Sequence, residues 1–66
     1  MTNEQVLKEI SEGDEVEVYV GKGQTRNFYV NLVMNLTDIN EVRLSLRDKV
    51  MPVYCDADAK DIVRRV

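Results

Sequence analysis

A lysine set between two glycines is the first pattern in this chain that could do chemistry. Gly21, Lys22 and Gly23 follow an alternating apolar run, and Arg26 comes three residues later. The backbone N–H groups of a glycine turn and a nearby lysine are suited to hold a phosphate. The same pattern is also typical of an ordinary turn that needs glycine for a positive φ angle. The residues alone leave both interpretations open.

A second basic group lies further along the chain. Arg43 and Arg47 alternate with apolar residues, so they share one face of a predicted strand, and Lys49 follows that strand. These side chains either meet a nucleic acid or form the solvated side of a half-covered sheet. We expect Arg47 and Lys49, nearer the glycine loop, to be the better candidates. Tyr19 and Tyr54 could stack on bases, although a tyrosine beside a strand more often packs against its neighbours.

No catalytic centre suggests itself in the residue types. There is no histidine, and Ser45 lies in mid-strand without an evident base. Cys55, the only cysteine, is followed by Asp56, whose negative charge disfavours a thiolate. One cysteine and no histidine also leave no ligand set with zinc spacing. We therefore expect a protein that is not an enzyme, with no cofactor and no metal.

Charge is unevenly distributed along the chain. The formal net charge is −3, yet the first 17 residues hold six acidic residues against one lysine. The rest of the chain holds six acidic residues against eight basic ones. Such asymmetry often indicates a charged partner or an internal mask, and we expect the acidic segment to hold the basic face in check. The alternative is a small domain that spreads its charges for solubility.

The first elements follow from capping and alternation. Thr2 and Gln5 have the spacing of a capping box, so a helix is expected to begin there and to end at Gly13. Alternating apolar residues predict a strand over 16–20.

The later elements follow from the same signals. Alternation predicts a strand over 42–47. Residues 50–55 could pair back as a short strand, which Pro52 would confine to an edge or a bulge. A final helix is expected from Asp56 to the end of the chain, because apolar residues recur there at helical spacing.

The segment "RNFYVNLVMNL", residues 26–36, fits two periods. With a period of two, one face is apolar: Phe28, Val30, Leu32 and Met34. With a period of 3.6, a different apolar stripe appears: Phe28, Tyr29, Leu32, Val33 and Leu36. Because strands usually stop near five or six residues, we predict a helix capped by Thr25.

Three stretches, "VYVGKGQTRNF", "NEVRLSLRDK" and "AKDIVRR", resemble the Alba family of archaeal and eukaryotic DNA- and RNA-binding proteins. The resemblance runs from about Glu15 to the end of the chain. Its strongest part joins the glycine loop to the run Arg26, Asn27 and Phe28. The other parts are residues 40–42, which open a strand that ends in basic residues, and residues 61–65.

The resemblance implies a small two-layer α+β fold, here with an extra N-terminal helix followed by the order β-α-β-(β)-α. The family's C-terminal strand hairpin is absent from this chain, which would be an acidic and C-terminally short member. The resemblance also implies a homodimer that binds DNA or RNA with little sequence specificity. Together with the patterns above, it predicts five nucleic-acid-binding residues: Lys22, Gly23, Arg26, Arg47 and Lys49.

Length and composition set the remaining expectations. The 66 residues make one domain, with a helix over 1–13 and a family-like body over 15–66. A core this small is marginal when alone, which also favours a homodimer. One cysteine, no signal peptide and no membrane span predict a cytoplasmic protein without a membrane partner. With few cations on the body, any binding should be weak and sensitive to salt.

Two other hypotheses stay open. In the first, an Alba-fold dimer binds no nucleic acid and serves as a protein-interaction or assembly module, as the acidic net charge favours. In the second, "NFYVNLVMN" forms a strand and the whole chain is a small β-barrel.

Overall fold

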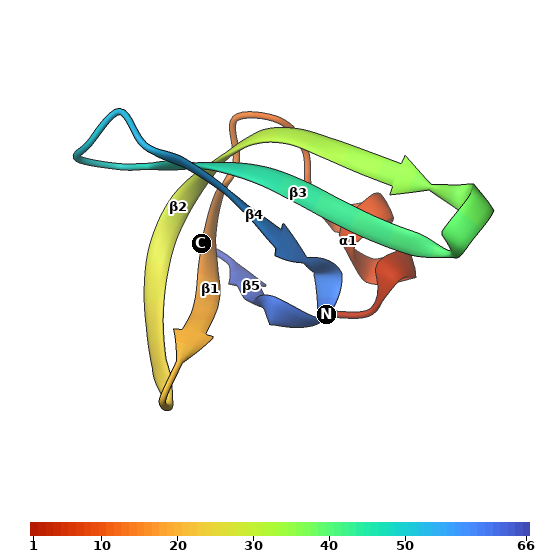
Figure 1. Cartoon of the computed structure of the whole chain (residues 1–66), viewed down its shortest axis with the longest axis horizontal. Coiled ribbons are helices and arrows are strands. Elements are labelled where there is room, and N and C mark those ends of the chain that lie inside the picture. The colour runs from red at the N-terminus through yellow and green to blue at the C-terminus, as the bar shows by residue number, and fades with distance from the viewer.

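Five strands form one antiparallel sheet in the order β4-β3-β2-β1-β5 in a computed structural model that describes residues 1–66 (Figure 1). A short helix precedes the strands, and a single 3₁₀ turn stands before β3 and another before β5. The elements are α1 (Asn3–Glu9), β1 (Glu15–Gly21), β2 (Gln24–Leu36), η1 (Thr37–Ile39), β3 (Glu41–Asp48), β4 (Tyr54–Asp58), η2 (Ala59–Asp61) and β5 (Ile62–Arg65).

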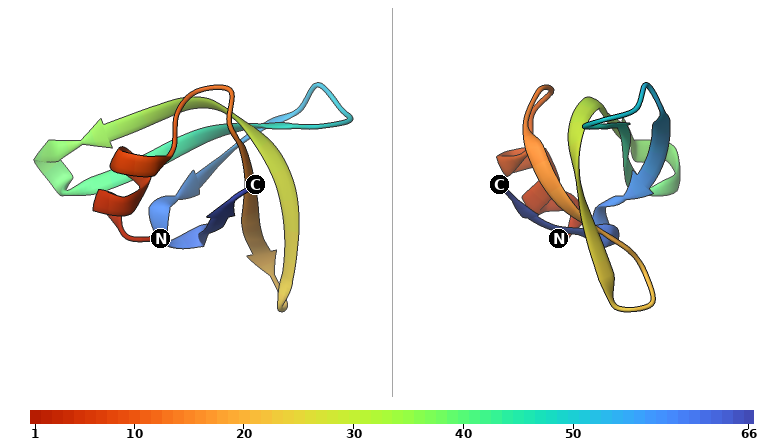
Figure 2. Two further views of the ribbon diagram at one scale, coloured as in Figure 1. Left: turned by 180° about the vertical axis from the view of Figure 1, so that it is seen from behind. Right: turned by 90° about the vertical axis from the view of Figure 1, so that its left-hand side faces the viewer.

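The long strand β2 gives the sheet its curvature. Its 13 residues pair with β1 over the first part and with β3 from Phe28 onward. The pairing with β3 slips between Val30 and Leu32, so that Asn31 is an extra residue. Such a bulge bends a strand and increases its twist. Figure 2 shows β2 arching over, so that the β1–β2 hairpin runs across the direction of the β2–β3 pair.

The core lies on the concave face of this curved sheet. Every strand except β4 contributes buried side chains, and Val6 of α1 and Ile10 just after it add two more. The helix lies beside β3 and η2. No polar or charged residue is buried. The buried residues are Val6, Ile10, Val16, Val18, Phe28, Val30, Val42, Leu44, Leu46, Ala59 and Ile62.

The predicted N-terminal helix is confirmed, although it is shorter than expected. The hydroxyl of Thr2 accepts the backbone N–H of Gln5, and the Gln5 side chain accepts the N–H of Thr2, as in a capping box. The helix ends at Glu9 rather than at Gly13, and Val6 and Ile10 anchor it in the core. Because Val6 and Ile10 are part of the core, α1 has a structural role. The expectation that the acidic N-terminal segment restrains the basic face stays a prediction.

The predicted helix over residues 26–36 is wrong. This segment is β2, in which Phe28 and Val30 point into the core. The alternation of buried and exposed residues holds up to the bulge at Asn31. The bulge bends β2, so that one long strand pairs with both β1 and β3. The β-barrel hypothesis assigned this segment correctly.

The predicted helix from Asp56 onward is wrong as well. The segment forms β4, the turn η2 and β5, with Ala59 and Ile62 buried at the turn. Val63 and Val66 remain about half exposed rather than forming a helical stripe. The two-layer α+β fold that the Alba resemblance implied is therefore wrong, because the chain is a curved sheet with one helix.

Both predicted strands with clear alternation are confirmed. The run over 16–20 is β1, and the run over 42–47 is β3, each slightly longer than expected. The strand expected over 50–55 is shifted, because β4 begins at Tyr54 and runs to Asp58. β4 is one of the two edge strands, and Pro52 lies in the loop before it. That position leaves the β3–β4 hydrogen bonds intact, as expected for proline beside a sheet.

Candidate nucleic-acid interface

Three side chains form a row across β2, β3 and β4. Tyr29 lies opposite Arg47, and Arg47 lies opposite Tyr54 in the next strand pair. Directly opposite residues project from the same face of a sheet. Because the neighbours Phe28 and Leu46 point into the core, this row lies on the outer, solvent-facing side.

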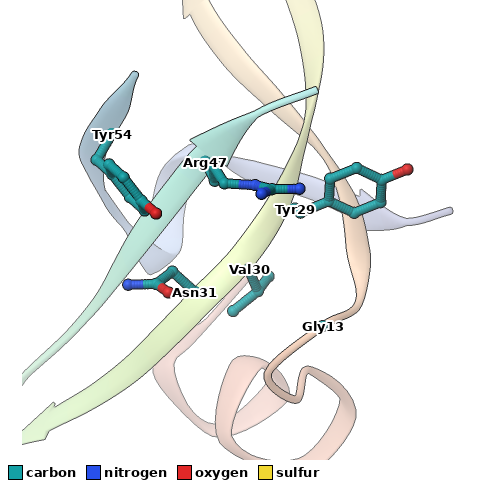
Figure 3. A pocket seen from close by; sticks show the side chains of 6 residues that line it. All are labelled: Gly13, Tyr29, Val30, Asn31, Arg47 and Tyr54. Carbon is teal, nitrogen blue, oxygen red and sulfur yellow. The ribbon is translucent and has the colours of Figure 1, made fainter. Parts of the chain in front are cut away.

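Arg47 packs against the ring of Tyr29, one of the two tyrosines in the row. Its guanidinium carbon is 5.7 Å from the centroid of the Tyr29 ring, a cation–π distance. Figure 3 shows the Arg47 guanidinium extending towards Tyr29, with Tyr54 on the opposite side of its stem. The ring of Tyr54 is therefore free to meet another planar group, and the residue is 59% exposed.

A hollow of about 350 Å³ lies beside the row. Asn31 reaches its rim because the bulge in β2 turns this side chain outward, and its Nδ2 donates to the Ser45 Oγ at 3.4 Å. The side-chain oxygen of Asn31 and the second hydrogen of its side-chain amide have no hydrogen-bond partner within the chain. The lining residues are Gly13, Tyr29, Val30, Asn31, Arg47 and Tyr54 (Figure 3).

Lys49 lies near the row, but an acidic residue neutralises it. Its Nζ donates to the Glu15 carboxylate at 3.0 Å and is 5.6 Å from the centroid of the Tyr29 ring. The same carboxylate oxygen accepts the amide of Asn27 at 2.9 Å. The hydrogen bond from Lys49, followed by that from Asn27, lowers the pKa of Glu15, and the bond to Glu15 raises the pKa of Lys49. Both groups are therefore charged at neutral pH.

Arg26 is also paired. It donates to the Asp48 carboxylate at 2.6 Å, and its guanidinium carbon is 5.5 Å from the centroid of the Phe28 ring. The other oxygen of Asp48 accepts the backbone N–H groups of Val50 at 2.8 Å and Met51 at 3.2 Å. These two backbone bonds are the main cause of the lowered pKa of Asp48. Arg26 thus stabilises the start of the β3–β4 loop through its ion pair with Asp48.

Lys22 and Gly23 lie at the tip of the β1–β2 hairpin, where both residues have positive φ angles of 55° and 73°. The N–H of Gly23 donates to the Tyr19 hydroxyl at 3.4 Å. No helix follows the tip, so the helix dipole expected to assist phosphate binding is absent. Tyr29 comes five residues after Gln24 in β2, which is roughly 16 Å of extended chain. The tip is therefore remote from the row.

The five predicted residues are thus divided among three places. Arg47 belongs to the row, Lys49 adjoins it, Arg26 braces a loop, and Lys22 and Gly23 form the distant hairpin tip. Sequence reasoning missed Tyr29 and Asn31, because both fell in the segment assigned to a helix. The period of two in residues 26–36 was the signal that could have found them, because it places Tyr29 and Asn31 on the face opposite the apolar residues Phe28 and Val30.

The thiol of Cys55 sits on β4 next to the row but faces away from it, opposite Leu46. Partial burial raises the pKa of Cys55, and the charges of Asp56 and Asp48 raise it further. The group is therefore a protonated thiol at neutral pH.

No protein-family model, curated protein or solved structure matches this chain. The resemblance to the Alba family stays a prediction, and the fold that it implied is not the one observed. The one α-helix is too short to cross a membrane, and no apolar helical span is present.

Proposed function

We propose that this protein binds single-stranded nucleic acid with little sequence preference through the row Tyr29, Arg47 and Tyr54. The observation that carries the proposal is the arrangement of two outward tyrosine rings on either side of an arginine in no ion pair. Unpaired bases stack on aromatic rings and on guanidinium planes, while the positive charge attracts the backbone.

The charge distribution favours a single strand over a duplex. Non-specific duplex binding depends on many phosphate contacts, whereas two of the four candidate cations are held by acids, Arg26 by Asp48 and Lys49 by Glu15. Stacking needs fewer cations, but the bases must be accessible. The proposal covers RNA and DNA alike, because the face of a base is common to both. Lys22 and Gly23 stay a separate predicted phosphate contact at the hairpin tip.

A fluorescence anisotropy titration tests the proposal. The protein is titrated with a labelled single strand and with the matching duplex at low and moderate salt. We expect the single strand to bind more tightly, and Tyr54→Ala to weaken it by about 1–3 kcal/mol, the cost of removing one stacking ring. Tyr19→Ala, which removes an equally large exposed ring near the hairpin tip, is the matched control. Equal affinity of Tyr54→Ala and the parent protein would contradict the proposal.

Self-association is a second candidate function, favoured by the two open edges of the sheet. β4 and β5 are the outer strands, and each presents unpaired backbone groups on one side. Such edges are templates for pairing with another chain. Pairing of like edges closes a homodimer, whereas pairing of β4 with β5 continues from chain to chain, into a ring where the rotation closes and otherwise into an open filament. Val63 in β5 and Val66 just after it are about half exposed and would gain cover wherever β5 is one of the paired edges.

Sedimentation velocity tests the assembly at micromolar concentration. We expect a species of at least two chains, and Val63→Asp on the β5 edge strand should shift it towards the monomer. Val20→Asp, an exposed valine in β1 near the hairpin tip, is the control. A folded parent protein that sediments as a monomer would rule out this second function without touching the first.

A further inference from the structure

The loop between β3 and β4 presents apolar side chains to solvent in an ordered form. Val50 is 91% exposed, Met51 60% and Val53 51%. The Asp48 carboxylate accepts the N–H groups of Val50 and Met51, and the Val53 carbonyl accepts the N–H of Asp48 at 2.9 Å. The N–H of Val53 in turn donates to the carbonyl of Met51 at 2.7 Å. A fixed apolar surface of this kind is typical of a binding site.

A second hollow, of about 240 Å³, lies between this loop and the row. Arg47 and Tyr54 line it and also line the first hollow, so these two side chains stand between the two spaces. The remaining lining residues of the second hollow are Asp48, Lys49, Val50, Met51 and Pro52. The apolar part of the lining is thus Val50, Met51 and Pro52. Of its charged residues, Lys49 is paired with Glu15 and Asp48 with Arg26, which leaves Arg47 without an acidic partner.

We infer that the second hollow holds a second nucleotide, adjacent to the one in the first hollow on the same strand. This inference rests on the proposed function. Its base contacts Val50, Met51 and Pro52 and uses the face of Tyr54 turned towards the loop. The phosphate that links the two nucleotides lies near Arg47, the residue common to both hollows. Each subunit therefore recognises a dinucleotide step rather than a single base.

The surface chemistry favours a nucleotide over an apolar protein segment as the occupant. A base is planar and apolar on its faces and carries a charged phosphate at its edge. The lining of the second hollow combines the apolar loop residues with Arg47, which has no acidic partner. Asp48 acts as a positioning residue, because its carboxylate accepts the N–H groups of Val50 and Met51 and so fixes the loop.

Length-dependent binding tests the inference on the full chain. Affinity is measured by NMR titration for a nucleoside monophosphate and for the dinucleotide and trinucleotide of the same base. We expect the dinucleotide to bind on the order of tenfold more tightly than the monophosphate, within the range for one stacked base. The trinucleotide should add little for one subunit.

Variants of the β3–β4 loop then test whether Val50 and Met51 contact the second nucleotide. The double variant Val50→Asn, Met51→Asn should keep the affinity for the monophosphate and lose the tenfold gain, and Val50→Asn alone should lose part of it. Ile39→Asn, which changes a 61% exposed residue in η1, is the matched control and should keep the gain. A double variant that keeps the gain, or a parent protein without it, would overturn the inference and leave the proposed function standing. A parent protein that binds none of the three would overturn both.

Discussion

Arg47 differs from its neighbours in having no acidic partner. Arg43, on the same strand and face, is bonded to Asp58 at 3.2 Å and lies 3.7 Å from Glu41. A paired guanidinium has most of its field cancelled and its donors occupied, whereas Arg47 keeps both for a ligand. We conclude that charge at this surface is decided by the pairing of each residue rather than by the number of basic residues.

The variant Arg47→Ala should weaken binding of every single strand to a similar extent. Because one phosphate contact on a single strand contributes about 0.7 to the salt slope, the slope of log K against log salt should become shallower by about that amount. Arg43→Ala removes an equal charge from the same strand and should leave the slope unchanged. Anisotropy titrations over a salt series measure both, and equal slopes for the two variants would contradict this role of Arg47.

The variant Glu15→Gln should have the opposite effect. It releases Lys49, which the Glu15 carboxylate holds at 3.0 Å, and so adds a free cation beside Tyr29. Binding at low salt should tighten, with the slope steeper by about 0.7. Glu17→Gln makes the same change of charge but releases Arg64 on β5, away from the row. Tighter binding by the Glu17 variant alone would show that Lys49 is not next to the bound strand.

At the scale of elements, clear alternation of apolar and polar residues was enough to predict β1 and β3 from the sequence. The same signal did not predict β2. Val30 is buried, while Asn31 and Leu32 are both exposed, because the bulge adds one residue to the strand. This slip moves the later apolar residues out of phase, so the whole segment also fits a helical period. A bulge depends on pairing with β3, which a local pattern cannot report.

The segment over 56–66 was predicted to be a helix for a related reason. Ala59 and Ile62 are buried three residues apart, as on one face of a helix. The spacing comes from the single 3₁₀ turn η2, which has three residues per turn and then leads into β5. Of the site, Arg47 and Lys49 were predicted from their strand and Tyr54 was noted as a stacking candidate. Tyr29 and Asn31 could not be placed without β2.

The β3–β4 loop depends on one carboxylate, which gives a prediction for this element. In Asp48→Ala the N–H groups of Val50 and Met51 lose their acceptor, and Arg26 loses its partner. Amide hydrogen exchange of Val50 and Met51 should therefore accelerate, while β3 remains protected. Asp38→Ala, in the exposed turn η1, should change neither. Unaltered exchange at Val50 and Met51 would show that other contacts hold the loop.

For the whole molecule, a small apolar core and a charged surface predict a characteristic pH dependence of stability. Hydrogen bonds from Lys49 and Asn27 lower the pKa of Glu15 from 4.5, those from Thr25 and Arg64 lower that of Glu17 from 4.5, and the loop N–H groups lower that of Asp48 from 3.8. A depressed folded-state pKa contributes stability that is present above the unfolded value and is lost as the pH falls through the folded value. No histidine titrates near neutrality.

Thermal melts followed by circular dichroism should therefore show a level melting temperature between neutral pH and about pH 5, and a fall below about pH 4.5. The triple variant Glu15→Gln, Glu17→Gln, Asp48→Asn should melt lower at neutral pH and fall less in acid, because it has lost these three titrations. A melting temperature of the parent protein that rises on acidification would contradict the assignment.

The central claim, that a single strand binds across Tyr29, Arg47 and Tyr54, is tested most directly by an NMR chemical-shift map of the folded protein with an unlabelled single-stranded oligonucleotide. The map separates the row from the hairpin tip, which lies roughly 16 Å away along β2. We predict that the largest changes occur at Tyr29, Asn31, Arg47 and Tyr54 and saturate together. Changes confined to the Lys22–Gly23 tip, or none at saturating oligonucleotide, would contradict the claim.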